Sequence, residues 1–231
     1  RFSVEMHDFQ VVRLPAMAFD PTQAPVSAGD LKPMLDHALR DALTNGSLQS
    51  QTGAGLAIGV FKQGERQILT YGAAKADSIF EIGSITKTFT GLLLAGMVSD
   101  GRTRLDEPVR QLLPRGLVPV RPGDEITLSD LATHHSGLPM MPDNFQPADR
   151  ANPYADYDVG KLYAYVKRRG LLKPEDRLYR YSNVGVGLLG QALAERTGKS
   201  YPVLLQEEIA GVLGLTDTVV TLTHEQRSRF L

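Results

Sequence analysis

The stretch from Phe89 to Val98 constrains the fold of this 231-residue chain more than any other feature. Apart from Thr90, its residues are apolar on nearly every side of a helix, as expected for a helix in a core. The helical pattern begins near Ser84 and ends before Asp100 and Gly101. The sequence therefore predicts a globular fold with a core helix at about residues 84–99.

The composition excludes several classes of site. Hydrophobic residues make up 42% of the chain and charged residues 22%, as in ordinary globular proteins. The 25 basic and 26 acidic residues form no long block of one sign, so neither a nucleic-acid surface nor a membrane surface is indicated. No apolar run approaches the roughly 20 residues of a transmembrane helix. The absence of cysteine excludes thiolate chemistry and Cys-ligated metals, and the adjacent side chains of His134 and His135 diverge, so no metal site is expected there.

The remaining patterns predict an α+β fold. Residues 1–27 are irregular, and the alternation at 2–12 fits either a strand or an arm packed on the main body. Residues 27–45 are expected to form a helix capped by Ser27, and residues 53–61 and 67–71 the strands of a hairpin. Helical periodicity returns at 127–133, 156–169, 182–197 and 201–213. We therefore divide the chain into residues 1–80, with the arm, helix and hairpin, and residues 81–231, which are mainly helical. Two strands alone are marginal, so only part of an antiparallel sheet with packed helices is expected in this chain.

An S-x-x-K motif opens the predicted core helix. Ser84 and Lys87 stand at positions i and i+3, which lie on one face of a helix, so their side chains can meet. A serine is a poor nucleophile until a base lies within hydrogen-bond reach, and a partly desolvated lysine can be that base. About one such motif is expected by chance in a chain of this length, so its interpretation depends on its context.

A second motif, Y-S-N at residues 181–183, lies where a loop meets a helix. A lysine nearby would lower the pKa of the Tyr181 phenol and make it a general base or acid toward Ser84. The Asn183 amide could bind both the lysine and a substrate carbonyl. The structural alternative is that Tyr181 is a packed aromatic residue and that Ser182 or Asn183 caps the helix.

Four segments in order resemble a known family. Residues 80–90, FEIGSITKTFT, are similar to the nucleophile segment of the serine β-lactamase and penicillin-binding-protein superfamily. Residues 130–139, DLATHHSGLP, resemble a segment that lies near its active site. The Y-S-N motif resembles the tyrosine motif of the class C β-lactamase branch, and residues 212–218 resemble the segment after the tyrosine helix. The resemblance covers about residues 28–231.

This resemblance implies roles for four residues. Ser84 would be the acylated nucleophile, Lys87 and Tyr181 would share the proton transfers, and Asn183 would position substrate and lysine. The family acts by two-step acyl transfer without metal or cofactor, in the periplasm or after secretion, on a small molecule or a peptide. A β-lactam or a D-alanyl-D-alanine peptide is the first expectation for the substrate. A carboxylesterase and a penicillin-binding sensor without turnover are the alternatives, and the oligomeric state is not indicated.

One part of the family pattern has no counterpart in this sequence. The family carries K-T-G or H-x-G on a strand after the tyrosine motif, and the similar triplets at 62–64, 135–137 and 196–198 do not fit in position. The sequence is therefore expected to be the N-terminal part of a longer protein whose C-terminal strands supply this motif. Two further patterns have structural interpretations: we interpret the G-x-G-x-x-G at 185–190 as close helix packing and residues 134–136 as a turn.

Overall fold

The computed structural model divides the chain into two units. The described residues are 28–46, 48, 53–62, 64–118, 123, 125–150, 152–171, 175 and 178–231. The helical unit contains residues 81–221, and the hairpin unit contains the described residues up to 80 together with 222–231. The sequence-based division assigned residues 222–231 to the helical region, whereas in the structure Phe230 forms a parallel bridge with Ile79. The arm expected at residues 1–27 lies outside the described residues.

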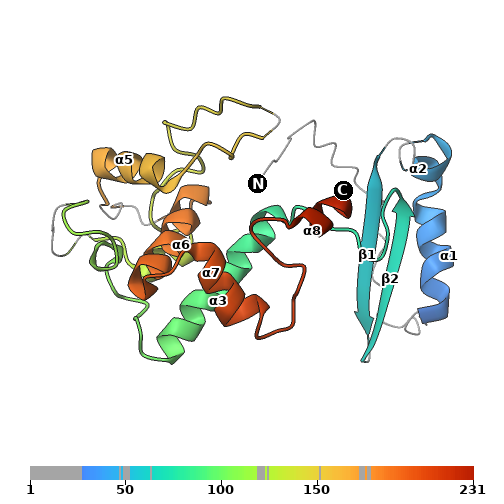
Figure 1. Ribbon diagram of the computed structural model, residues 1–231, viewed down its shortest axis with the longest axis horizontal. Helices are drawn as coiled ribbons and strands as arrows, with labels where there is room; N and C mark the ends of the chain where they lie inside the picture. The colour runs from blue at the N-terminus through green and yellow to red at the C-terminus, as the bar shows by residue number, and fades with distance from the viewer. Residues whose placement is uncertain are drawn as a thin grey trace. The chain divides into compact units, whose positions relative to one another are not determined.

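The hairpin unit consists of two strands and three short helices. Its elements are α1 (Ala28–Ala38), α2 (Arg40–Thr44), β1 (Gly55–Lys62), β2 (Glu65–Gly72) and α8 (His224–Ser228). The predicted hairpin is confirmed: β1 and β2 pair antiparallel, with Gly55 opposite Gly72. Helix α1 runs beside the hairpin (Figure 1), and Tyr71 of β2 donates a 2.9 Å hydrogen bond to Asp36 of α1.

Two helices of the hairpin unit differ from expectation. The single helix expected at 27–45 is interrupted at Leu39, whose φ of −94° and ψ of 3° separate α1 from α2. Its expected N-cap, Ser27, lies outside the described residues. Helix α8 was not predicted, because five polar residues carry no apolar periodicity, and it is started by a capping box between Thr223 and Gln226.

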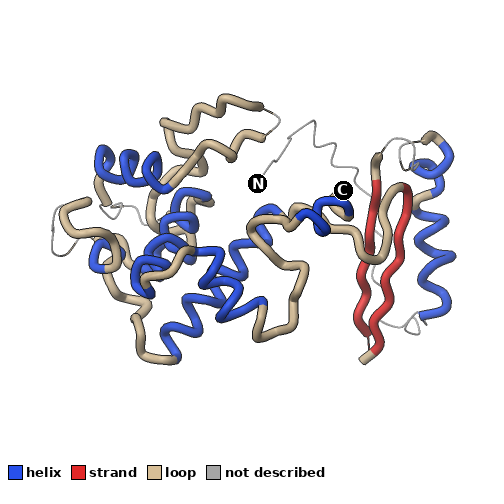
Figure 2. Tube along the Cα trace, viewed as in Figure 1, coloured by secondary structure: helices blue, strands red, loops and turns tan. Residues whose placement is uncertain are grey.

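The helical unit carries the remaining helices. They are the 3-10 turn η2 (Gly83–Ile85), α3 (Thr86–Ser99), the 3-10 turn η3 (Val109–Gln111), α4 (Leu128–Ala132), α5 (Val159–Arg169), α6 (Asn183–Thr197), α7 (Tyr201–Leu205) and the π-helical segment η4 (Gln206–Ala210). A long loop separates α4 from α5 (Figure 2). The helix expected at 201–213 is α-helical only to Leu205 and then widens into η4. No helix of the described residues is long and apolar enough to cross a membrane.

Helix α6 lies at the centre of the core of the helical unit. It contacts α3, α4, α5 and α7. Its residues Leu188, Leu189 and Leu193 are fully buried, and burial of each contributes about 1.5–3 kcal/mol. Helix α3 packs Met97 into the same core, but its Leu92 is 46% exposed. Within this unit the predicted core helix therefore buries one side rather than its whole circumference.

Caps set the helix ends near the site. The capping box expected at α4 is confirmed: Thr127 Oγ1 accepts the N–H of Asp130, and Asp130 Oδ2 accepts the N–H of Thr127. Helix α5 begins at Val159, later than the expected residue 156, because Asp158 accepts a backbone N–H of its first turn. Helix α6 ends where expected, at Gly198, whose φ of 68° is left-handed.

Candidate active site

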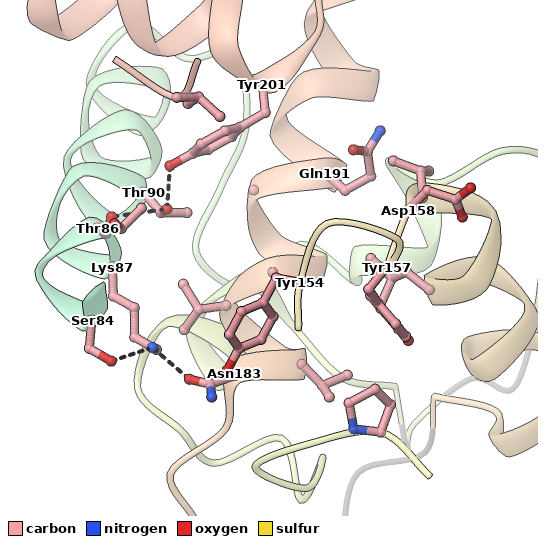
Figure 3. Close-up of a pocket in the computed structure, with 18 of the residues that line it drawn as sticks. Ser84, Thr86, Lys87, Thr90, Tyr154, Tyr157, Asp158, Asn183, Gln191 and Tyr201 are labelled. Atoms are coloured by element: carbon pink, nitrogen blue, oxygen red, sulfur yellow. Dashed lines mark hydrogen bonds between the residues drawn. The ribbon is translucent and has the colours of Figure 1, made fainter. Parts of the chain in front are cut away.

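Ser84 and Lys87 meet at the start of α3. Ser84 lies on the 3-10 turn η2 rather than on the α-helix itself, and Lys87 is in the first turn of α3. The i, i+3 spacing still brings them together, and Lys87 Nζ donates a 3.0 Å hydrogen bond to Ser84 Oγ (Figure 3). Ser84 is exposed. A substrate can therefore reach a hydroxyl that already contacts an amine.

Tyr181 approaches the same hydroxyl from the segment before α6. Its phenol donates a 2.6 Å hydrogen bond to Ser84 Oγ, and Lys87 Nζ lies 4.7 Å from the centre of its ring. Partial burial raises the pKa of the Tyr181 phenol, but hydrogen bonding to Lys87 and Ser84 and the Lys87 charge lower it. The balance holds the pKa of Tyr181 below its ordinary value, in the direction that suits a general base.

Asn183, the first residue of α6, completes the cluster. Its Oδ1 accepts a 2.7 Å hydrogen bond from Lys87 Nζ, and its side-chain amide lies 3.5 Å from Met141 Sδ. Figure 3 shows Ser84, Lys87 and Asn183 side by side at one end of the pocket. The structure thus brings together all four residues named from the sequence.

Ser182, between them, has a structural position. It is fully buried. Its Oγ accepts the N–H of Gly185 at 2.8 Å and donates to the carbonyl of Pro139 at 2.7 Å. Ser182 is therefore the N-cap of α6, so both interpretations of the Y-S-N motif apply, to different residues: the middle residue caps the helix while the outer two face Lys87.

His134 also belongs to the site, although the sequence assigned it only to a turn. Its ring lies on that of Tyr181, with centroids 4.6 Å apart, and its Nδ1 accepts the N–H of Ser182 at 3.1 Å. Burial, the Lys87 charge and the neighbouring His135 lower the pKa of the His134 imidazole. The one available signal was the resemblance of residues 130–139 to a segment near the family's active site.

A pocket of about 660 Å³ opens beside Ser84. Ser84, Lys87 and Asn183 stand at one end of it, while Tyr201 and Thr90 share a 2.8 Å hydrogen bond at its wall (Figure 3). The rest of the lining is mostly apolar and aromatic, including Phe145, Tyr154, Tyr157, Leu162 and Val220. Among the described residues there is no group of three or more His, Asp or Glu side chains that could hold a metal ion. The pocket has the size and lining of a small-molecule site.

The three glycines of the G-x-G-x-x-G pattern serve two purposes. A Cβ at Gly185 would lie 3.2 Å from Ser182 Oγ, and one at Gly190 would lie 3.0 Å from the Tyr201 ring. These two glycines permit close packing, as expected. Gly187 differs, because a Cβ there would meet nothing within 4 Å and the residue lines the pocket. The absence of a side chain at Gly187 therefore adds to the open space of the pocket.

Comparisons with known proteins agree with the motif resemblance. The family model described as Beta-lactamase matches residues 39–230. A beta-lactamase of Pseudomonas fluorescens is 30% identical over 203 residues, covering 82% of this chain and 52% of that protein. The D-alanyl-D-alanine-carboxypeptidase/endopeptidase AmpH of Escherichia coli is 31% identical over 188 residues, covering 77% of this chain and 48% of that protein. The chain spans about half the length of the curated relatives it matches.

Solved structures share the fold. A class C beta lactamase from Rhodobacter sphaeroides is 31% identical with a TM-score of 0.62, covering 84% of this chain and 52% of that chain. A beta-lactamase/D-alanine carboxypeptidase from Yersinia pestis, at 24% identity, has a TM-score of 0.70 and covers 89% of this chain and 60% of that one. The predicted α+β fold is thereby confirmed. With a family model matched over most of its length, the chain belongs to the beta-lactamase family, in the class C branch of the serine β-lactamase and penicillin-binding-protein superfamily.

Proposed function

We propose that this chain carries the nucleophile and the proton-transfer groups of a serine hydrolase that forms a covalent acyl-enzyme with a β-lactam or a D-alanyl-D-alanine-type peptide. The supporting observation is the position of Ser84 Oγ, 3.0 Å from Lys87 Nζ and 2.6 Å from Tyr181 OH. A hydroxyl between two such groups has an acceptor for its proton within reach as it attacks. The names of the relatives, beta-lactamase and D-alanyl-D-alanine-carboxypeptidase, support this substrate class.

In the proposed first step, Ser84 Oγ bonds to the substrate carbonyl carbon while its proton passes to the Tyr181 oxygen. The lowered pKa of Tyr181 makes the phenolate accessible at a lower pH than in free tyrosine. The carbonyl–nitrogen bond then breaks, and Tyr181 returns the proton to the leaving nitrogen. The developing oxyanion would be held by backbone N–H groups, one of them that of Ser84 at the start of the helical turn.

The remaining groups have supporting roles in this scheme. Lys87 donates to Ser84 Oγ and Asn183 Oδ1 and places a positive charge near the phenolate. The Asn183 side-chain amide is then available to a substrate carbonyl next to the scissile bond. In the second step a water molecule gives up a proton to the same base as its oxygen bonds to the acyl carbon. The bond from that carbon to Ser84 Oγ then breaks, and Tyr181 returns the proton to Ser84 Oγ.

A carboxylesterase of the same family is the alternative, and the apolar lining of the pocket supports this alternative. Aromatic and aliphatic residues such as Phe145, Tyr154 and Leu162 line a volume of about 660 Å³ next to the nucleophile. An apolar wall of this extent suits an acyl group without charges. The acylation chemistry is unchanged, with oxygen in place of nitrogen as the leaving atom.

The test uses the complete protein and three substrates. Intact mass is followed after incubation with a penicillin, and turnover is measured with nitrocefin and with p-nitrophenyl butyrate. We expect a mass increase equal to one penicillin, its later loss, and nitrocefin turnover, all absent in Ser84→Ala. Ester turnover alone would favour the esterase, and a lasting mass shift without turnover would favour a sensor. The absence of both acylation and turnover would refute the proposal.

The same proposal places the protein in the periplasm or outside the cell, where β-lactams and peptidoglycan peptides are encountered. This location rests on the family resemblance. Fractionation of the source cells, with nitrocefin or ester turnover measured in each fraction, would test it, and activity confined to the cytoplasm would contradict it.

A further inference from the structure

His134 holds a backbone conformation that a residue with a side chain rarely adopts. Its φ is 63°, and no other non-glycine residue in the described part of the chain has a positive φ. This conformation is strained and persists only where surrounding contacts enforce it. Histidine is one of the few side chains enriched there. The contacts of His134 therefore indicate which part of the site this strained conformation stabilises.

Those contacts fall on three consecutive residues before α6. The carbonyl of His134 accepts the N–H of Arg180 at 2.8 Å. Its ring lies on that of Tyr181 with an interplanar angle of 37°, and its Nδ1 accepts the N–H of Ser182 at 3.1 Å. His134 thus holds, from one side, the segment that presents the Tyr181 phenol to Ser84.

The hydrogen bond from Ser182 determines which form of the imidazole is present. A backbone N–H can only donate, so Nδ1 must be unprotonated and a neutral ring carries its proton on Nε2. A protonated ring would set an N–H of Nδ1 against the N–H of Ser182, and the hydrogen bond would be lost. The orientation of the segment therefore depends on the charge of this ring.

The surroundings of His134 favour the neutral form. The titratable groups that face its ring are Lys87 of α3, Tyr179 and Tyr181 before α6, and the adjacent His135. Asp130 of α4, the nearest carboxylate in the sequence, is engaged in the cap at Thr127. Burial, Lys87 and His135 all lower the pKa of the imidazole.

We propose that His134 in its neutral form is a positioning residue: it aligns Tyr181 OH with Ser84 Oγ, and protonation of the imidazole at acid pH releases Tyr181 and switches acylation off. This rests on the proposed function of Ser84 and Tyr181. In this proposal His134 does not contact the substrate.

Three variants separate positioning from a merely structural role. His134→Asn retains an acceptor at the place of Nδ1 and tolerates positive φ, but it cannot be protonated. His134→Ala removes both the acceptor and the ring. His135→Asn is the matched control, because His135 Nδ1 lies 3.0 Å from Thr133 Oγ1 instead of contacting Ser182.

The kinetic readout is the pH dependence of kcat/KM for nitrocefin or p-nitrophenyl butyrate, whichever the wild type turns over. The wild-type rate should fall more steeply at acid pH, because His134 must be neutral as well as Tyr181 deprotonated. Since the pKa of His134 is lowered, this fall should set in below the ordinary histidine pKa, near 6.5. His134→Asn should keep most of the wild-type kcat/KM at pH 8 and lose the steeper fall at acid pH. His134→Ala should lower kcat/KM about tenfold or more at every pH. The control His135→Asn should keep the steeper fall. The steeper fall persisting in His134→Asn, or wild-type rates in His134→Ala, would overturn the proposal.

A second readout requires no turnover. Nitrogen NMR of the protein with labelled histidine should show His134 at pH 8 with Nδ1 unprotonated and Nε2 protonated. A proton on Nδ1 at that pH would overturn the proposal. If the wild type turns over neither substrate, the proposed hydrolase function fails, while the tautomer of His134 still decides whether Ser182 is held as described.

Discussion

Lys87 and Asn183 are 96 positions apart in the chain, and Lys87 Nζ donates a 2.7 Å hydrogen bond to Asn183 Oδ1. The same Nζ donates to Ser84 Oγ at 3.0 Å, so two of its three donors are directed by neighbours. The contact joins the first turn of α3 to the first turn of α6, the two helices that pack in the core. The lysine is therefore oriented by rigid elements, as its proposed role in proton transfer requires.

Removal of the Asn183 acceptor should leave Lys87 less well oriented. We expect Asn183→Ala to lower the acylation rate by a penicillin about ten- to a hundredfold, since small displacements of a reacting group have effects of this size. Intact-mass time courses measure the rate. Thr197→Ala at the other end of α6 is the control, because within the described part of the chain its hydroxyl donates to carbonyls of its own helix. Equal effects in the two variants would show that helix stability, and not Lys87, is responsible.

Tyr181→Phe should distinguish the contribution of the phenolic hydroxyl from that of the aromatic ring. The ring contacts with His134 and Lys87 remain, while the 2.6 Å hydrogen bond to Ser84 is lost. If Tyr181 is the general base, acylation should fall about 10²- to 10⁴-fold with little change in melting temperature.

The pH dependence of the acylation rate gives a second test of Tyr181→Phe, because the direction of the change with pH can be predicted. A base acts when deprotonated, and the pKa of Tyr181 is lowered, so the wild-type rate should rise with pH before the range of an ordinary tyrosine, near 10. Tyr181→Phe should lose that rise. Tyr179→Phe, an exposed neighbour, should keep it. A rise that persists in Tyr181→Phe would assign the base to another group.

Local spacing could predict some of these contacts. Ser84 and Lys87 are i, i+3 neighbours, so their contact follows from helical geometry, and it survives the change from α-helix to the 3-10 turn η2. The capping box at Thr127 is equally local. Tyr181 and Asn183 were candidates by their chemistry, but only the family resemblance favoured that interpretation over a structural one, because no spacing rule relates them to Lys87.

Other features depend on tertiary contacts and could not be predicted. The positive φ of His134 is enforced by residues 180–182, which lie far along the chain. Gly187 looks like its two neighbouring glycines in the sequence, and only the space around its Cα distinguishes it. The pairing of Ile79 with Phe230 has no local signal, since an isolated bridge carries no alternation pattern.

Ser182 links helix stability to the site. It is fully buried, and Ser182→Ala would lose the N-cap and leave the Pro139 carbonyl without its donor. We expect a loss of about 1–3 kcal/mol in the free energy of unfolding, measured by urea denaturation. Ser200→Ala is the control, because Ser200 is the N-cap of α7 but its side chain makes no capping hydrogen bond. A loss of equal size there would contradict the role given to the Ser182 hydroxyl.

Gly187 offers a test of what the pocket accepts. Its position in α6 is helical, and a Cβ there meets no atom within 4 Å, so Gly187→Ala should stabilise the helix by about 0.5–1 kcal/mol. Gly187→Leu should fold as well and extend its side chain into the pocket. If the pocket takes the acyl group, this variant should lower kcat/KM for p-nitrophenyl octanoate about tenfold more than for the acetate.

Gly190→Ala is the control for Gly187→Leu, because it disturbs the packing of α6 without placing a long side chain in the pocket. Its Cβ would lie 3.0 Å from the Tyr201 ring, so we expect it to lower the melting temperature, because the packed ring cannot easily give way. The ratio of kcat/KM for the octanoate to kcat/KM for the acetate should stay closer to the wild-type ratio in Gly190→Ala than in Gly187→Leu. An unchanged ratio in Gly187→Leu, in a variant that melts like the wild type, would show that the acyl chain binds elsewhere and would remove the main support for the esterase alternative.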